Sequence, residues 1–374
     1  MSKATKIIIG VIIAIIIIGG IWYIATREPK EEGEIKVGVS AGLTGEAATW
    51  GQSVLAGVTL ATEEINNKGG INGKKIKLIV EDDKMQAIDA ANAVNKLINI
   101  DNVTAILLGS GSGATSSAVP IIKQGKIPSI ITIASAPNLA DGDYIFRVSP
   151  SDSVQGKFSA EFIKNQMGLN KIALVYVKND WGQGIADVFK KNFLELGGEI
   201  VYEAGILQNI VDLKTEIAKI KNTDAEALYM PIYPNSALAF FRQAKEAGLN
   251  LPIICGDAIE SEEVIENEYA EGVIYNIAKM ASSAEFAEKI KNLEGFENLS
   301  TNIGGPLGYD AAKILFSAIE KVGTDKEKIK EELSKTFYKN GESNPVIEFD
   351  ENGDIKTPIF EARIIRDKKT IPYE

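Results

Sequence analysis

The most constraining feature of this 374-residue chain is a repeated alternation of short apolar segments with longer amphipathic ones. Apolar runs between polar turns predict strands, whereas apolar residues three or four positions apart predict helices. Strands are predicted at 35–40, 75–81, 103–108, 129–134, 171–177, 199–205, 225–230 and 251–255, with helices between them. Strands connected in this way lie parallel, and their crossover helices cover both faces of the sheet. The chain is therefore expected to be an α/β protein.

The two halves of this alternation resemble each other. A Trp-Gly-Gln tripeptide at 50–52 opens one helix, and a glycine pair at 69–70 ends it. The same tripeptide at 181–183 and a glycine pair at 197–198 bracket a later helix, and residues 152–155 are the expected crossover. Two similar Rossmann-like lobes are predicted, since the chain is also too long for one core. Ligands of open parallel sheets bind beyond the carboxyl ends of the strands, which places the site between the lobes.

The first 33 residues are set apart from this pattern as a membrane segment with its linker. Residues 7–25 carry no charge, enough for a helix that crosses a bilayer core of roughly 30 Å. Lys3 and Lys6 precede the run, which places the short end in the cytoplasm and the lobes outside. We predict an uncleaved anchor, because the run is long for a signal peptide and no typical cleavage site follows it. A cleaved signal is the alternative.

Composition excludes several classes of function. The net charge of −11 argues against a nucleic-acid partner. The chain has no histidine and a single cysteine, Cys255. Catalysis through a histidine dyad or triad, histidine-ligated metals, intrachain disulfides and cysteine-based zinc or iron–sulfur clusters are therefore all excluded. Serine–lysine or carboxylate chemistry stays possible, but we expect a binding protein without a cofactor and not an enzyme.

A glycine-rich segment at 109–114, reading GSGSGA, follows a predicted strand and opens a helix. A dinucleotide-binding loop would need an acid at the end of the next strand, but that strand ends in residues 133–137, which read IASAP. A tight structural turn is one alternative. The other is capture of a carboxylate by N–H groups at the helix N-terminus together with the Ser112 hydroxyl, with Ser135 as a second hydroxyl.

A ligand with a carboxylate and an ammonium group would also need an acid on the opposite lobe. Asp257 follows the strand at 251–255, where it acts either as a cap or as the partner of an ammonium group. Trp50, Trp181 and Tyr233 also follow predicted strands or begin helices. Each alone is compatible with ordinary packing, but together they could enclose an apolar side chain.

The chain resembles the leucine/isoleucine/valine-binding-protein family, the type I periplasmic solute-binding proteins of ABC importers. The resemblance runs from about residue 35 to the C-terminus. Its motifs are Gly42-Leu43-Thr44-Gly45 with Trp50-Gly51, Asn66-Asn67-Lys68-Gly69-Gly70-Ile71-Asn72-Gly73, Glu81-Asp82-Asp83, Gly308-Tyr309-Asp310-Ala311-Ala312 and Phe349-Asp350-Glu351-Asn352-Gly353-Asp354.

This resemblance implies a Venus-flytrap architecture with three crossovers. One lobe would comprise 34–150 with 278–342, and the other 151–277 with 343–374. In amino-acid-binding members, the residues matching Ser112 and Ser135 bind the ligand carboxylate through their hydroxyl and N–H groups. The carbonyl matching Ile133 and an acid matching Asp257 bind the ammonium group.

Aromatic residues matching Trp50, Trp181 and Tyr233 enclose the ligand side chain in those members. Two departures bear on specificity: Trp181 stands where a smaller aromatic is common, and Asp257 is one methylene shorter than the glutamate of some members.

The resemblance implies an extracytoplasmic receptor that closes around an α-amino acid, with a branched-chain one expected, and passes it to an ABC permease. One alternative is a ligand sensor of the same fold. Another is an importer receptor for an amide, for urea or for a small carboxylate; Asp257 favours a ligand with a cationic group.

Overall fold

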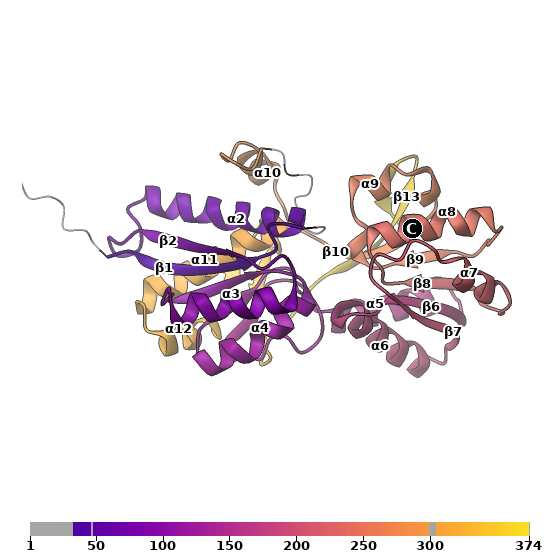
Figure 1. Cartoon of the computed structure of the whole chain (residues 1–374), viewed down its shortest axis with the longest axis horizontal. Coiled ribbons are helices and arrows are strands. Elements are labelled where there is room, and N and C mark those ends of the chain that lie inside the picture. Colours follow the sequence, from indigo (N-terminus) through magenta and orange to yellow (C-terminus); the bar gives the residue numbers. More distant parts are fainter. Residues whose placement is uncertain (1–32, 46–47, 298, 300–303, 374) are drawn as a thin grey trace, which may run out of the picture.

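The computed structural model describes residues 33–45, 48–297, 299 and 304–373, which form two lobes joined by narrow connections (Figure 1). The predicted membrane segment at 7–25 lies outside the described residues. Within the described part, none of the helices combines the length and the apolar character that crossing a membrane requires.

The first lobe is built on a five-stranded parallel sheet in the order β2-β1-β3-β4-β5. Its strands are β1 (Ile35–Ala41), β2 (Ile76–Asp82), β3 (Ala105–Gly109), β4 (Ser129–Ile131) and β5 (Ile145–Arg147). β3 is apolar and buried along its whole length, as expected for a parallel strand covered on both faces. β4 is shorter than the strand predicted at 129–134, so Ile133 and Ser135 lie in the loop that follows it.

Helices cover both faces of this sheet. One face carries α2 (Ala48–Asn67), α11 (Gly304–Val322) and α12 (Lys326–Leu333), and the other carries α3 (Ala87–Asn99) and α4 (Ser112–Gly125). α2 and α11 pack unusually closely: a Cβ on Gly57 would lie 2.0 Å from the carbonyl oxygen of Gly305. Only glycine permits this approach. α10 (Ala284–Lys291) packs on the outer side of α2 through Phe286 and Ile290.

The second lobe has a seven-stranded sheet in the order β14-β13-β10-β9-β8-β6-β7. Its strands are β6 (Lys171–Val177), β7 (Glu199–Ile206), β8 (Ala227–Met230), β9 (Ile253–Cys255), β10 (Ile274–Ala278), β13 (Phe360–Arg366) and β14 (Lys369–Pro372). The parallel pairing predicted for this lobe is confirmed among β6, β7, β8 and β9, while β13, which the sequence did not predict, runs antiparallel to β10 and to β14. The β13–β14 hairpin turns at Asp367 and Lys368, both with positive φ, a sequence that signals such a turn only weakly.

Helices also cover both faces of the second sheet. α5 (Asp152–Glu161), continued by a π-helical turn at Phe162–Gln166, packs with α6 (Asp180–Glu195) on one face. α7 (Lys214–Lys221) and α8 (Pro234–Glu246) cover the other, and the short α9 (Glu262–Ile265) follows β9. The carboxyl ends of β6, β8 and β9 carry Asn179, Tyr233 and Asp257 toward the first lobe.

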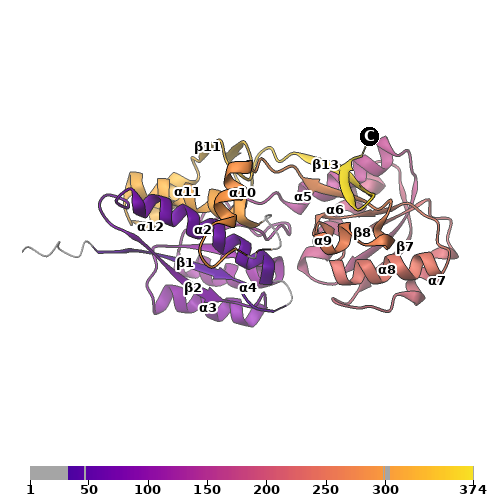
Figure 2. The same cartoon turned by 90° about the horizontal axis from the view of Figure 1, so that it is seen from above.

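The chain passes between the lobes three times, before α5, after β10 and before β13 (Figure 2). The hairpin of β11 (Phe337–Lys339) and β12 (Val346–Glu348) belongs to the first lobe, because Ile347 and Ile355 lie in the core under the first sheet. The last crossing therefore comes after Ile355, later than the boundary predicted at 342–343. The Lys279 N–H donates to the Ile359 carbonyl at 2.8 Å, so the second and third crossings run side by side.

Candidate functional site

Ser112 and Ser135 lie close together on the first lobe. Ser112 is the first residue of α4, immediately beyond β3, and its hydroxyl accepts a hydrogen bond from the Ala136 N–H at 3.1 Å. This bond holds the loop that carries Ser135 against the helix N-terminus. The first N–H groups of a helix have no partner within the helix and favour an anion. Together with the hydroxyls, they make this end of the site suited to a carboxylate.

A buried acid holds the loop before Ser112 in place. The Asp83 carboxylate accepts from Ser40 at 2.7 Å and from Ser110 at 2.6 Å. These residues follow or end β2, β1 and β3, so one side chain ties three neighbouring strand ends together. Burial raises the pKa of Asp83. Asp82, beside it, accepts from the N–H of Leu43 at 2.9 Å and so fixes the loop that precedes α2.

The apolar part of the site lies on the second lobe. Trp181 and Tyr233 stack with ring centroids 4.9 Å apart and an interplanar angle of 23°. Val177 and Ala258 pack around them, and Asn179 donates to the Tyr233 hydroxyl at 3.2 Å. Trp181 is only 6% exposed, so the pair forms a fixed wall. Trp50 lies apart from this stack, half-buried in the first turn of α2 on the first lobe.

Asp257 begins a 3₁₀ turn, Asp257–Ile259, directly after β9 and beside the aromatic wall. Burial raises its pKa to about 6, against the opposing effect of a hydrogen bond from Gln155, and the negative charge of Glu260 adds to the increase. Because burial disfavours the ionised carboxylate, a positively charged partner would stabilise it. Ile133, whose carbonyl was the other predicted ammonium ligand, is half-buried against the core of the first lobe.

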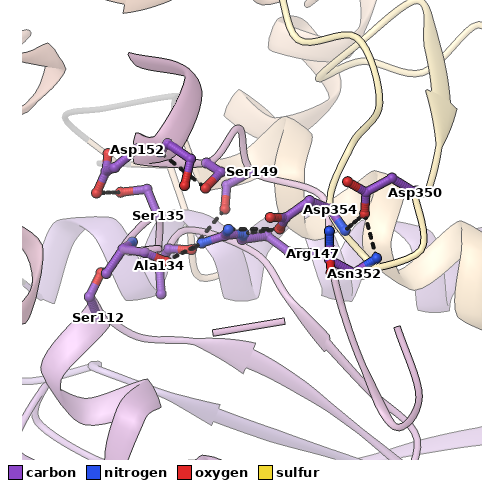
Figure 3. Close-up of polar contacts among 12 residues, drawn as sticks. Ser112, Ala134, Ser135, Arg147, Ser149, Asp152, Asp350, Asn352 and Asp354 are labelled. Carbon is purple, nitrogen blue, oxygen red and sulfur yellow. Dashed lines mark hydrogen bonds and ion pairs between the residues drawn. The ribbon is translucent and has the colours of Figure 1, made fainter. Parts of the chain in front are cut away.

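A buried arginine fixes the Ser135 loop, as Figure 3 shows. Arg147, at the end of β5, donates to the carbonyl oxygens of Ala134 at 3.3 Å and Ala136 at 2.7 Å. Its Nε and Nη2 both lie 2.7 Å from Asp354 Oδ1, so the loop is joined to the turn after β12, just before the last crossing. Sequence reasoning missed Arg147 as a site residue, although a charged residue inside an apolar strand beside a predicted crossover was a usable signal.

Asp152 is a second acid at the site that sequence reasoning placed in the crossover without a role. Its Oδ2 accepts from the Ser135 hydroxyl at 3.1 Å, and its N–H donates to the Ser135 carbonyl at 2.8 Å (Figure 3). The side chain is 0% exposed. Burial, and then the charge of Asp257, raise the pKa of Asp152 well above its usual range, against the opposing effect of Arg147.

A cavity of about 680 Å³ lies between the lobes, beside these residues. The first lobe contributes Ser116 and Pro137 to its lining, and the second contributes Asn179, Gln183 and Asp187. The predicted ligand residues border this space through their neighbours Ala136 and Asp180 and do not line it themselves. In the described part of the chain, no three acidic or cysteine side chains converge as a metal site.

With this geometry established, comparison with known proteins gives a consistent result. The family model of periplasmic binding proteins matches residues 34–369. The chain is 28% identical over 333 residues to the leucine-, isoleucine-, valine-, threonine- and alanine-binding protein of Pseudomonas aeruginosa, which covers 86% of this chain and 87% of that protein.

Two solved structures are similar over nearly the whole described chain. A leucine-binding protein of Thermotoga maritima is 27% identical with a TM-score of 0.82, covering 91% of this chain and 98% of that one. The substrate-binding protein of a branched-chain amino acid transporter from Streptococcus pneumoniae, solved with isoleucine, is 26% identical with a TM-score of 0.78, covering 90% and 97%.

Proposed function

The chain belongs to the periplasmic binding protein family, and we propose that it is the extracytoplasmic receptor of an ABC importer for an α-amino acid, with a branched-chain one preferred. The relatives named for leucine, isoleucine and valine support this ligand class. The resemblance to the leucine/isoleucine/valine-binding proteins found in the motifs is confirmed by the same relatives.

The observation that carries the proposal is the opposite polarity of the two sides of the site. The first lobe offers a helix N-terminus with Ser112 and Ser135, which suit a carboxylate. The second lobe offers Asp257, which suits an ammonium group. An α-amino acid carries both groups on one carbon, so it would bridge the lobes and favour the closed state.

The wall of Trp181 and Tyr233 accounts for the proposed preference among side chains. Stacked rings with little exposure offer an apolar surface and few hydrogen bonds to a polar side chain. In the proposal, Trp50 covers the ligand from the first lobe on closure, and the Ile133 carbonyl meets the ammonium group. The moving units would be 34–150 with 278–355, and 151–277 with the remaining C-terminal residues.

We propose that the receptor changes no bond in its ligand and that it meets a permease at the membrane. Residues 7–25 would anchor it there without cleavage, as the charge-free run and its flanking lysines suggest. The intact mass of receptor extracted from membranes decides this point: a chain that begins near Met1 supports the anchor, and a chain trimmed past residue 25 replaces it with a signal peptide.

Thermal unfolding tests the ligand class. A soluble form beginning at Glu34, first stripped of any ligand by unfolding and refolding, would be scanned against the twenty amino acids, short amides and urea. A ligand at about 100 times its dissociation constant adds roughly 2.7 kcal/mol to the free energy of unfolding. A raised midpoint with leucine, isoleucine or valine supports the proposal. A response to amides or urea alone would replace the amino acid and remove the role given to Asp257.

A further inference from the structure

The carboxyl groups of Asp152 and Asp257 interact electrostatically beside the proposed ligand site, and one of their oxygens has no hydrogen-bond partner among the described residues. Asp152 Oδ2 is engaged by Ser135, but Asp152 Oδ1 is buried without a hydrogen-bond partner among the described residues. Burying a polar atom without a hydrogen-bond partner costs free energy, and the cost is larger for a charged oxygen. The arrangement therefore needs either a proton on this carboxyl group or a partner that arrives later.

Asp257 approaches the same region from the end of β9. Gln155 stands one helical turn after Asp152 on α5, and it hydrogen-bonds Asp257 while also donating to the Asn276 carbonyl at 2.9 Å. The two acids therefore lie along one side of α5. Their charges interact, since ionised Asp257 makes ionisation of Asp152 harder. Two interacting carboxyl groups with little solvent cannot both ionise easily.

The other charged and titratable groups around the pair do not relieve this repulsion. Arg147 is the cation that faces Asp152, but it is already bonded to Asp354 and to two carbonyl oxygens. Glu260, on the turn after β9, adds negative charge beside Asp257. Tyr229 of β8 and Tyr233, just before α8, interact electrostatically with both acids, and their hydroxyls remain neutral because burial raises their pKa values.

We propose that Asp152 and Asp257 share one proton in the empty receptor and that the ammonium group of the amino acid replaces it. The inference rests on the proposed function and deepens it. On binding, the O–H bond of the protonated carboxyl group breaks and the proton passes to the buffer. The amino acid keeps its own ammonium protons, and the cation then lies against two carboxylates, one of them with an oxygen that had no partner.

This exchange couples affinity to pH. The ionised pair is the form that binds, so protons compete with the ligand. Burial, and then the charge of Asp257, hold the pKa of Asp152 well above its usual range, so the pair keeps this proton through the weakly acidic range. When one proton leaves per ligand bound, affinity rises about tenfold for each pH unit. The receptor would thus hold its amino acid more weakly in an acidic surrounding.

Calorimetric titration of leucine at about pH 6.5, in buffers that differ in ionisation enthalpy, counts the protons released. We expect about one proton per leucine for the unaltered receptor. Asp152→Asn should lower the release to well below one proton, because the remaining acid, Asp257, has a pKa of about 6 and is mostly ionised at this pH. Ser112→Ala is the matched control: it should weaken binding at the carboxylate end and leave the proton release unchanged.

The outcomes separate the two proposals. Leucine binding without proton release, or full release in Asp152→Asn, overturns the shared proton and leaves the receptor function standing. Absence of binding by any amino acid overturns the receptor function and this inference with it. If Asp152→Asn does not fold, the affinity of the unaltered receptor for leucine between about pH 5.5 and 6.5 decides: a tenfold rise supports the proposal, and a constant affinity contradicts it.

Discussion

The Arg147 guanidinium and the Asp354 carboxylate lie 2.7 Å apart although 207 residues separate them in the sequence. Arg147 is 0% exposed and also holds the two carbonyl oxygens that shape the Ser135 loop. The pair therefore connects the proposed carboxylate site with the turn after β12, which precedes the last crossing between the lobes.

Removal of this charge should destabilise the whole protein. Arg147→Met leaves the Asp354 carboxylate without its partner, and breaking a buried ion pair from one side costs about 3–5 kcal/mol. Urea unfolding would measure the loss. The double variant Arg147→Met with Asp354→Asn is the control and should recover part of the stability, because it removes both charges. A single variant as stable as the unaltered protein would show that the pair is not structurally important.

Asp257 should be essential for binding an amino acid. Asp257→Ala leaves the ammonium group of a bound ligand in a buried site without its carboxylate, and we expect at least about tenfold weaker binding by calorimetry. Glu260→Gln, which changes a charge in the same turn, is the matched control and should alter affinity far less. Equal affinity in Asp257→Ala and the unaltered receptor would remove Asp257 from the site.

A close contact between the lobes should limit how they meet. A Cβ on Gly184 of α6 would lie 2.7 Å from Cδ of Pro137, in the loop after Ser135. Gly184→Val should push this loop or the lobes apart. Overpacking costs about 1–3 kcal/mol, which corresponds to roughly 5- to 150-fold weaker ligand binding. Lys191→Val, on the exposed side of the same helix, should leave calorimetric affinity unchanged. If both variants bind equally well, this contact does not constrain closure.

Asp310 should make stability depend on pH. Its carboxylate accepts from the Ser343 N–H at 2.7 Å and the Ser343 hydroxyl at 2.6 Å, and burial raises its pKa to about 6 from 3.8. Because the pKa of Asp310 is higher in the folded state, protonation of Asp310 stabilises the fold. This stabilisation is complete below the pKa of the unfolded state and is lost as pH rises through about 6. The difference amounts to at most about 3 kcal/mol.

Urea unfolding of the unaltered protein and of Asp310→Asn, at about pH 4.5 and about pH 7, isolates this effect. The free energy of unfolding of the unaltered protein, relative to that of Asp310→Asn, should be larger at the lower pH. Asp224→Asn is a surface control of opposite sign, since Lys171 lowers the pKa of Asp224. The same difference in free energy of unfolding between the unaltered protein and Asp310→Asn at both pH values would contradict a raised pKa in the folded state.

Sequence periodicity predicted the α/β architecture because parallel strands covered on both faces are apolar throughout, as in β3. The β13–β14 hairpin was not predicted, because Asp367 and Lys368 adopt positive φ in its turn without a glycine to indicate it. The position of the third crossing was not predicted, because the burial of Ile347 and Ile355 depends on contacts with distant segments.

The site was predictable only in part, for the same reason. Ser112 follows an apolar strand and opens a helix, so its position could be read locally. Arg147 and Asp152 act through partners far away in the sequence, Asp354 and Asp257, and a single sequence does not contain that pairing. The Trp181–Tyr233 stack likewise joins the start of α6 to the residue before α8.

A crystal structure of the receptor grown with saturating leucine tests the central claim most directly. The account predicts one leucine between the lobes, with its carboxylate at Ser112 and Ser135, its ammonium group at Asp257 and its side chain against Trp181 and Tyr233. A leucine bound in the reverse orientation, or bound outside these residues, would contradict the account, as would a space between the lobes that stays empty of leucine.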